Sequence, residues 1–129
     1  MKNLLLIFIV SLAAASAALA QHGGKAEPKG ITFAAGKTST VLSATLGRDE
    51  EMDYVFSAKK GQKVTITNPN TSLFDVRIFS DENNVETEFD SSRTFSLTLP
   101  ADGDYLLYVR KKMVKTPSRA RFSITLAIK

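Results

Sequence analysis

The sequence predicts an all-β protein, folded as a single-domain antiparallel β-sandwich of about seven to eight strands. Two observations predict this class. Apolar and polar residues alternate with a period of two in one segment after another, and turn-forming residues separate these segments at intervals of roughly ten positions. No stretch of useful length repeats its apolar residues at the helical period. The 129-residue chain is long enough for one domain with its own core after a leader of about 20 residues is removed.

That leader, residues 1–20, has the pattern of a bacterial secretory signal peptide. Lys2 supplies a positive start, an apolar stretch spans residues 4–12, and an A-x-A cleavage signal ends at Ala20. A membrane anchor is the alternative, but no basic flank follows the apolar stretch to stop its transfer. A lipid anchor would need a cysteine after the leader, and the chain has none. We therefore expect cleavage after Ala20, no membrane insertion, and a periplasmic or secreted protein.

The mature chain begins with a predicted tail and continues into the sandwich. Residues 21–30 are polar and rich in glycine and lysine, so we expect them to be flexible. The β-sandwich domain is expected to occupy residues 31–129.

Four strands are expected in the first half of the domain. Segment 41–46 places two leucines and an alanine on one face, and segment 54–57 places its two aromatic residues on one side. Segment 63–67 alternates and ends at an Asn-Pro-Asn turn. Segment 74–79 directs three apolar residues inward.

Three further strands complete the predicted sheets. Segment 94–99 alternates and is stopped by Pro100, and an Asp-Gly-Asp turn follows at residues 102–104. Segment 105–109 is apolar on both faces, as expected for a central strand. Segment 122–128 alternates almost to the C-terminus, so we expect the end of the chain to be fixed in a sheet.

Composition argues against an enzyme. The chain has no cysteine, and its one histidine, His22, lies just after the leader. Disulfides, thiolate metal ligands and Ser-His or Cys-His nucleophiles are therefore excluded, and no cofactor or metal is expected. The Asp-Gly-Asp turn lacks the glutamate of an EF-hand loop, so a hairpin is favoured over a calcium site. A glycosidase would need two carboxylates facing one pocket at the appropriate spacing.

The charge distribution points to one candidate binding segment. Without Lys2 the chain has 16 basic and 13 acidic residues, a balance too mild to indicate nucleic acid. Acidic clusters at 49–53 and 81–90 are equally well explained as solvated edges and loops. Residues 110–121 contain cations and no acid, and they connect two predicted strands across about a dozen residues, which is long for a hairpin.

This basic connection also contains an apolar Met113-Val114 pair and a stiffening proline. A cationic, partly apolar protrusion on a rigid sandwich suits insertion into an acidic cleft of another protein. The alternatives are a solvated loop, or a loop that binds anionic lipid or polysaccharide.

Two motifs resemble those of a known family. Residues 58–64 (Ala-Lys-Lys-Gly-Gln-Lys-Val) and 99–105 (Leu-Pro-Ala-Asp-Gly-Asp-Tyr), with the alternating last strand, resemble the periplasmic inhibitors of goose-type (g-type) lysozyme. They also resemble the broader pre-peptidase C-terminal β-sandwich domains, and the resemblance covers roughly residues 47–129. It implies a bacterial defence protein that blocks the peptidoglycan-binding cleft of a lysozyme with its loops and catalyses nothing.

The resemblance places the inhibitory arginines in the loop after the strand 105–109. Many relatives have Met-Arg early in this loop, where this chain has Met113-Val114, and Arg48 stands where inhibitors use an aromatic residue. The cationic role would then have moved to neighbouring lysines and arginines, or the target differs. The residues expected to contact lysozyme are Arg48, Lys111, Lys112, Met113, Lys115 and Arg119. A generic extracytoplasmic module that binds envelope polysaccharide or protein is the alternative, and the sequence leaves the oligomeric state open.

Overall fold

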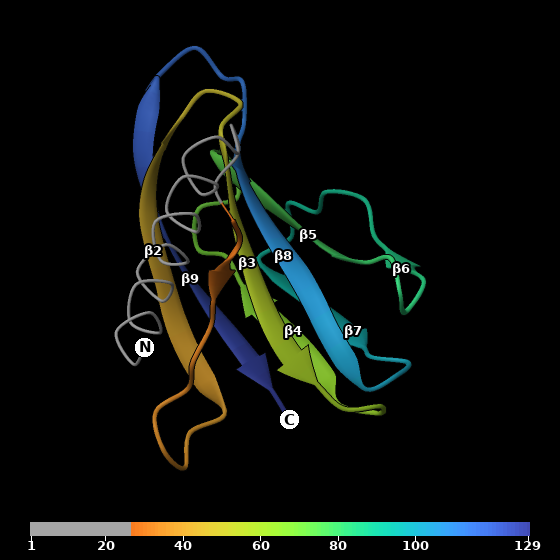
Figure 1. Cartoon of the computed structure of the whole chain (residues 1–129). Helices are drawn as coiled ribbons and strands as arrows, with labels where there is room; N and C mark the ends of the chain where they lie inside the picture. The colour runs from red at the N-terminus through yellow and green to blue at the C-terminus, as the bar shows by residue number, and fades with distance from the viewer. Residues whose placement is uncertain (1–26) are drawn as a thin grey trace, which may run out of the picture.

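The computed structural model describes residues 27–129, so the predicted signal peptide and the first part of the predicted tail lie outside the described residues. Two sheets pack face to face, which confirms the all-β sandwich (Figure 1). Residues 27–129 contain no helix, and hence none that could cross a membrane.

The two sheets contain five and four strands, with orders β1-β3-β8-β5-β6 and β2-β9-β4-β7. The larger sheet consists of β1 (Lys29–Gly30), β3 (Glu51–Ala58), β5 (Phe74–Ser80), β6 (Val85–Glu86) and β8 (Gly103–Lys111). The smaller sheet consists of β2 (Ser39–Gly47), β4 (Lys63–Thr67), β7 (Thr94–Thr98) and β9 (Arg119–Ile128). Each of the seven predicted segments coincides with one of the long strands. The short edge strands β1 and β6 bring the number to nine, above the seven to eight expected.

The core lies between the sheets and is almost entirely apolar. Every second side chain of β5, β8 and β9 is buried there, as period-two alternation requires. The buried apolar side chains of these strands are Phe74, Val76, Ile78, Tyr105, Leu107, Val109, Phe122, Ile124, Leu126 and Ile128. The ring of Phe74 packs edge to face on Phe122 with centroids 5.6 Å apart, and the Tyr105 hydroxyl donates to the Ala101 carbonyl at 2.6 Å. Packing of this kind has to hold a chain without cysteine together.

The N-terminal segment is more ordered than the predicted tail. Lys29 and Gly30 pair in parallel with Tyr54 and Val55 of β3, and the Ile31 N–H donates to the Val55 carbonyl at 2.9 Å. Residues 29–30 therefore belong to the larger sheet, although the sequence predicted a tail through residue 30. Local composition does not show this pairing, since its partner lies 25 positions further along the chain.

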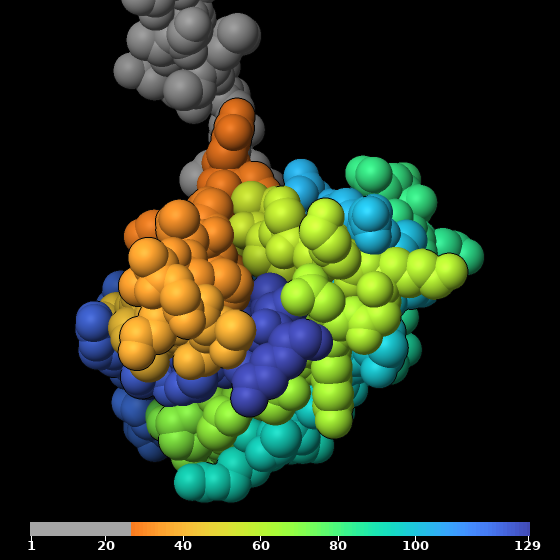
Figure 2. Space-filling model, turned by 90° about the horizontal axis from the view of Figure 1, so that it is seen from below, coloured from red at the N-terminus to blue at the C-terminus, as the bar shows by residue number. Residues whose placement is uncertain are grey.

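Residues 31–38 then cross from one sheet to the other at one end of the sandwich. Figure 2 views that end, where this segment (orange) lies beside the last residues of the chain (blue). The Ile128 N–H donates to the Thr38 carbonyl at 2.9 Å, and Ile128 also pairs with Val64 of β4. The C-terminus is fixed in the smaller sheet, as predicted.

Candidate functional site

Three connections meet at the opposite end of the sandwich, which we call the loop end. They are the β2–β3, β4–β5 and β8–β9 connections, towards the top of Figure 1, and they comprise residues 48–50, 68–73 and 112–118. Strand register brings them together, because Gly47 pairs with Arg119 and Phe74 pairs with Lys111. The candidate residue Arg48 and the basic β8–β9 connection therefore lie at the same end of the molecule.

The basic connection is shorter than predicted. Residues 110–111 belong to β8 and residues 119–121 to β9, so the free loop spans only 112–118. The expected loop of about a dozen residues is therefore wrong. The strands extend beyond their apolar residues because Arg110 pairs with both Glu51 and Asp75, and Arg119 pairs with Gly47. Hydropathy along the chain does not reveal such pairings.

Lys111 is buried, whereas its prediction as a contact residue needs an exposed side chain. The alternation of β8 turns its side chain inward, where the residue is 0% exposed. The Lys111 ammonium donates to the Lys112 carbonyl at 3.1 Å. The Lys111 backbone exchanges hydrogen bonds with the β2–β3 turn, as donor to the Glu50 carbonyl (2.9 Å) and acceptor from the Asp49 N–H (3.0 Å).

Lys112 is half-buried and connects two loops. Its backbone N–H donates to the Leu73 carbonyl at 2.8 Å, and its Nζ donates to the Thr71 carbonyl at 2.8 Å. Both acceptors lie in the β4–β5 connection. The β8–β9 loop is thus attached at its first residue to a neighbouring loop by two short hydrogen bonds.

The other four predicted contact residues are exposed at the loop end. They are Arg48, Met113, Lys115 and Arg119, and we call them the exposed set. The Met113 side chain is among the most exposed large apolar groups of the described chain, at 68%. Within residues 27–129, ion pairs are found for Arg77 and Arg110 only, so the cations of the exposed set have no carboxylate partner there. One apolar group and three cations are free to face a partner.

The β2–β3 turn fixes the position of Arg48. The Glu50 N–H donates to the Gly47 carbonyl at 3.1 Å, and the Glu50 carboxylate accepts the Gly47 N–H at 2.6 Å. Asp49 takes a left-handed conformation with φ of 58°. A Cβ atom at position 47 would lie 3.2 Å from Glu50 Oε1 and 3.4 Å from the Arg119 guanidinium, so glycine permits this close approach.

The loop end is less purely cationic than the linear sequence indicates. Asp49, Glu50 and Glu51 belong to the first acidic cluster of the sequence, and the turn places them beside the basic loop. Their carboxylates lower the net positive charge that a partner meets. The electrostatic potential at this end therefore depends on where individual cations point as well as on total charge.

Sequence reasoning missed an ion pair beneath the loop end. Asp75 is only 5% exposed, and its two carboxylate oxygens accept hydrogen bonds from Arg110 Nε and Nη2 at 3.1 and 2.8 Å. The Phe89 ring covers the Arg110 guanidinium at 3.8 Å from its centroid. The hydrogen bond to Asp75 raises the pKa of Arg110. Thirty-five positions separate the two residues, so no local pattern pairs them.

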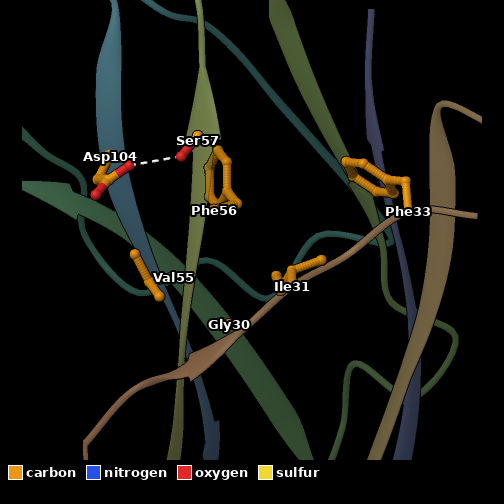
Figure 3. Close-up of a pocket in the computed structure, with 7 residues that line it drawn as sticks. All are labelled: Gly30, Ile31, Phe33, Val55, Phe56, Ser57 and Asp104. Carbon is orange, nitrogen blue, oxygen red and sulfur yellow. Dashed lines mark hydrogen bonds between the residues drawn. The ribbon is translucent and has the colours of Figure 1, made fainter.

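Two surface cavities away from the loop end bear on the possibility of catalysis. The first, of about 290 Å³, lies between the N-terminal crossing segment and strands β3 and β8 (Figure 3). It contains one carboxylate, Asp104, which accepts a hydrogen bond from the Ser57 hydroxyl at 2.6 Å. The second, of about 360 Å³, also contains Asp81 and Glu82. All three acids are exposed to water, whereas the acid of a glycosidase needs a desolvated environment.

The sequence predicted a turn over the whole Asp-Gly-Asp segment, but only Asp102 lies in a bend, and Gly103 and Asp104 are the first two residues of β8. The Asp102 carboxylate accepts the Lys60 N–H at 2.8 Å, and Gly103 has φ of 142°. Among residues 27–129, no three aspartate, glutamate or histidine side chains gather closely enough to hold a metal ion.

Comparison with known proteins gives structural neighbours only. No family model matches the chain, and no curated protein sequence matches it significantly. The PliG protein of Salmonella Typhimurium, a periplasmic inhibitor of g-type lysozyme, has a similar structure with a TM-score of 0.65 and 25% identity, covering 81% of this chain and 100% of that chain. A mutant PliG of Escherichia coli gives a TM-score of 0.62 and 25% identity, with coverages of 80% and 100%.

A more distant likeness extends to another kind of protein. The pre-peptidase C-terminal domain of a Bacillus anthracis collagenase has a TM-score of 0.51 and 14% identity, covering 80% of this chain and 95% of that domain. This second likeness concerns the fold alone. Together the neighbours confirm the structural resemblance that the two sequence motifs predict.

Proposed function

We propose that this protein inhibits a g-type lysozyme by inserting its loop end into the substrate cleft, without catalysing a reaction. The similarity in structure to PliG inhibitors supports an inhibitor role. The periplasmic location of those neighbours also supports export of this chain, with residues 1–20 as its signal peptide and a periplasmic or secreted mature protein.

The observation that carries this proposal is the position of the exposed set. Arg48, Met113 and Lys115 project from two adjacent loops whose bases are attached to the sandwich by backbone hydrogen bonds, and Arg119 projects from the first residue of β9. A lysozyme cleft contains catalytic carboxylates, so guanidinium and ammonium groups complement its charge. Rigid presentation lowers the entropy that binding would otherwise cost.

The test is lysis of peptidoglycan by a g-type lysozyme with and without the purified mature protein. The expected result is inhibition that saturates near one inhibitor per enzyme. Full lytic activity in the presence of a large molar excess would end the proposal. Lysozymes of other classes, assayed in parallel, would show whether inhibition is confined to the g-type enzyme.

A further inference from the structure

Lys112 is the most firmly held residue of the β8–β9 loop. Its N–H, its carbonyl and its side chain each take part in a hydrogen bond. The N–H donates to Leu73 at 2.8 Å, the Nζ donates to Thr71 at 2.8 Å, and the carbonyl accepts the buried Lys111 ammonium at 3.1 Å. Bonds with a charged donor are stronger than neutral ones, and two of these three have one.

The rest of the loop, residues 113–118, lacks such attachments to the described part of the chain. Among the hydrogen bonds of the described residues, none involves residues 113–118, and five of these six residues are exposed. The loop therefore has a fixed start at Lys112 and a fixed end at Arg119, where β9 begins to pair with β2. The geometry between these points depends on how firmly both ends are held.

We propose that Lys111 and Lys112 are positioning residues for the proposed inhibitory loop and make no contact with the partner themselves. They fix the start of the loop so that Met113 and Lys115 are presented in a binding orientation. This inference rests on the proposed function for its consequence in inhibition, but the attachment itself is a property of the free protein.

The burial of Lys111 supports a positioning role. An ammonium group taken out of water is unfavourable unless it is paired, and within residues 27–129 this one has a single carbonyl partner and no carboxylate. An apolar residue would suit this core position better on packing grounds alone. The hydrogen bond to the Lys112 carbonyl is what the lysine adds.

The test compares Lys112→Met with Lys115→Met in the mature protein. Both variants lose one positive charge from the same loop, but only the first loses a hydrogen bond to another loop. We expect exchange of the backbone N–H at position 112, which donates to the Leu73 carbonyl in the free protein, to become about tenfold faster in Lys112→Met, the factor that corresponds to one strong hydrogen bond, and to stay unchanged in Lys115→Met. Lys112→Arg, which retains donors of similar reach, should restore slow exchange.

Inhibition assays over a series of salt concentrations separate positioning from contact. Lys112→Met should weaken inhibition by a similar factor at every salt concentration, whereas Lys115→Met should also lower the dependence on salt. Unchanged exchange in Lys112→Met, with a melting temperature equal to that of the wild type, would overturn the inference. A wild type that fails to inhibit would instead end the proposed function, and the exchange data would still decide whether Lys112 holds the loop.

Discussion

The base and the tip of the β8–β9 connection have the same charge in the sequence and opposite surroundings in the structure. At the base, Lys111 is buried and Lys112 is attached to the β4–β5 loop. At the tip, Met113 and Lys115 are exposed and form no hydrogen bond within residues 27–129. The comparison shows that a run of cations can be part buried scaffold and part exposed surface. Only strand register and burial distinguish the two parts.

Loss of the Asp75–Arg110 ion pair beneath the loop end should give the largest loss of stability. Asp75→Asn leaves the Arg110 guanidinium under Phe89 without its carboxylate, and we expect the free energy of unfolding to fall by about 2 kcal/mol. Chemical denaturation measures this loss. Glu86→Gln is the control, because its partner Arg77 lies 3.8 Å away and the Glu86 side chain is 68% exposed, and it should cost less than about 0.5 kcal/mol.

The exposed part should affect inhibition and leave stability unchanged. Changing Arg48, Lys115 and Arg119 together to alanine should raise the inhibition constant by about 30-fold, which corresponds to about 2 kcal/mol of binding free energy. The melting temperature should remain within about 2 °C of the wild type, because exposed charges contribute little to folding.

The control for this triple variant lies at the opposite end of the sandwich. Lys59, Lys60 and Lys63 are exposed in and beside the β3–β4 turn, and their change to alanine removes the same total charge. Inhibition should be nearly unchanged. If both triple variants weaken inhibition equally, net charge rather than the loop end determines binding.

Lys111→Met tests the role of the buried lysine through its effect on the free energy of unfolding. Methionine fills a similar volume without a buried ammonium, so the free energy of unfolding should change by less than about 1 kcal/mol or increase. Denaturation curves measure this change. A loss of several kcal/mol would show that the ammonium stabilises the core, which contradicts the role assigned to it.

The smallest expected effect is that of salt on inhibition by the wild-type protein. Raising ionic strength from about 0.05 to 0.3 M should weaken inhibition only severalfold, because the acids of the β2–β3 turn offset part of the positive charge. Inhibition constants measured across this range give the slope. A steep slope would indicate a more strongly cationic surface than the loop end presents.

Most of the fold could be predicted from the sequence, because each long strand carries its own alternation. In β2 the side chains of Leu42, Ala44 and Leu46 pack in or against the core, and residues 41, 43 and 45 are exposed, as the pattern requires. The position of Asp75 could not be predicted in this way. It occupies an outward position on β5, where it is buried and pairs with Arg110, whose guanidinium lies over the ring of the distant Phe89.

The candidate site could be predicted only in part, because the sequence shows where charges lie along the chain but not the strand register that places them in space. Arg48 and the basic segment could be selected from charge and from the family resemblance, and register then brought them together. The inward orientation of Lys111 follows from the alternation of β8, but only once that strand is known to extend through residue 111. Apolar residues end at Val109, so the sequence assigned residues 110 and 111 to the loop.

The most direct test of this account is amide exchange of the protein in complex with a g-type lysozyme. We expect new protection at residues 47–50 and 113–119 and none at residues 31–38 or 59–62, at the other end of the sandwich. Protection confined to that other end, or to the outer face of either sheet, would contradict the assignment of the loop end as the inhibitory surface.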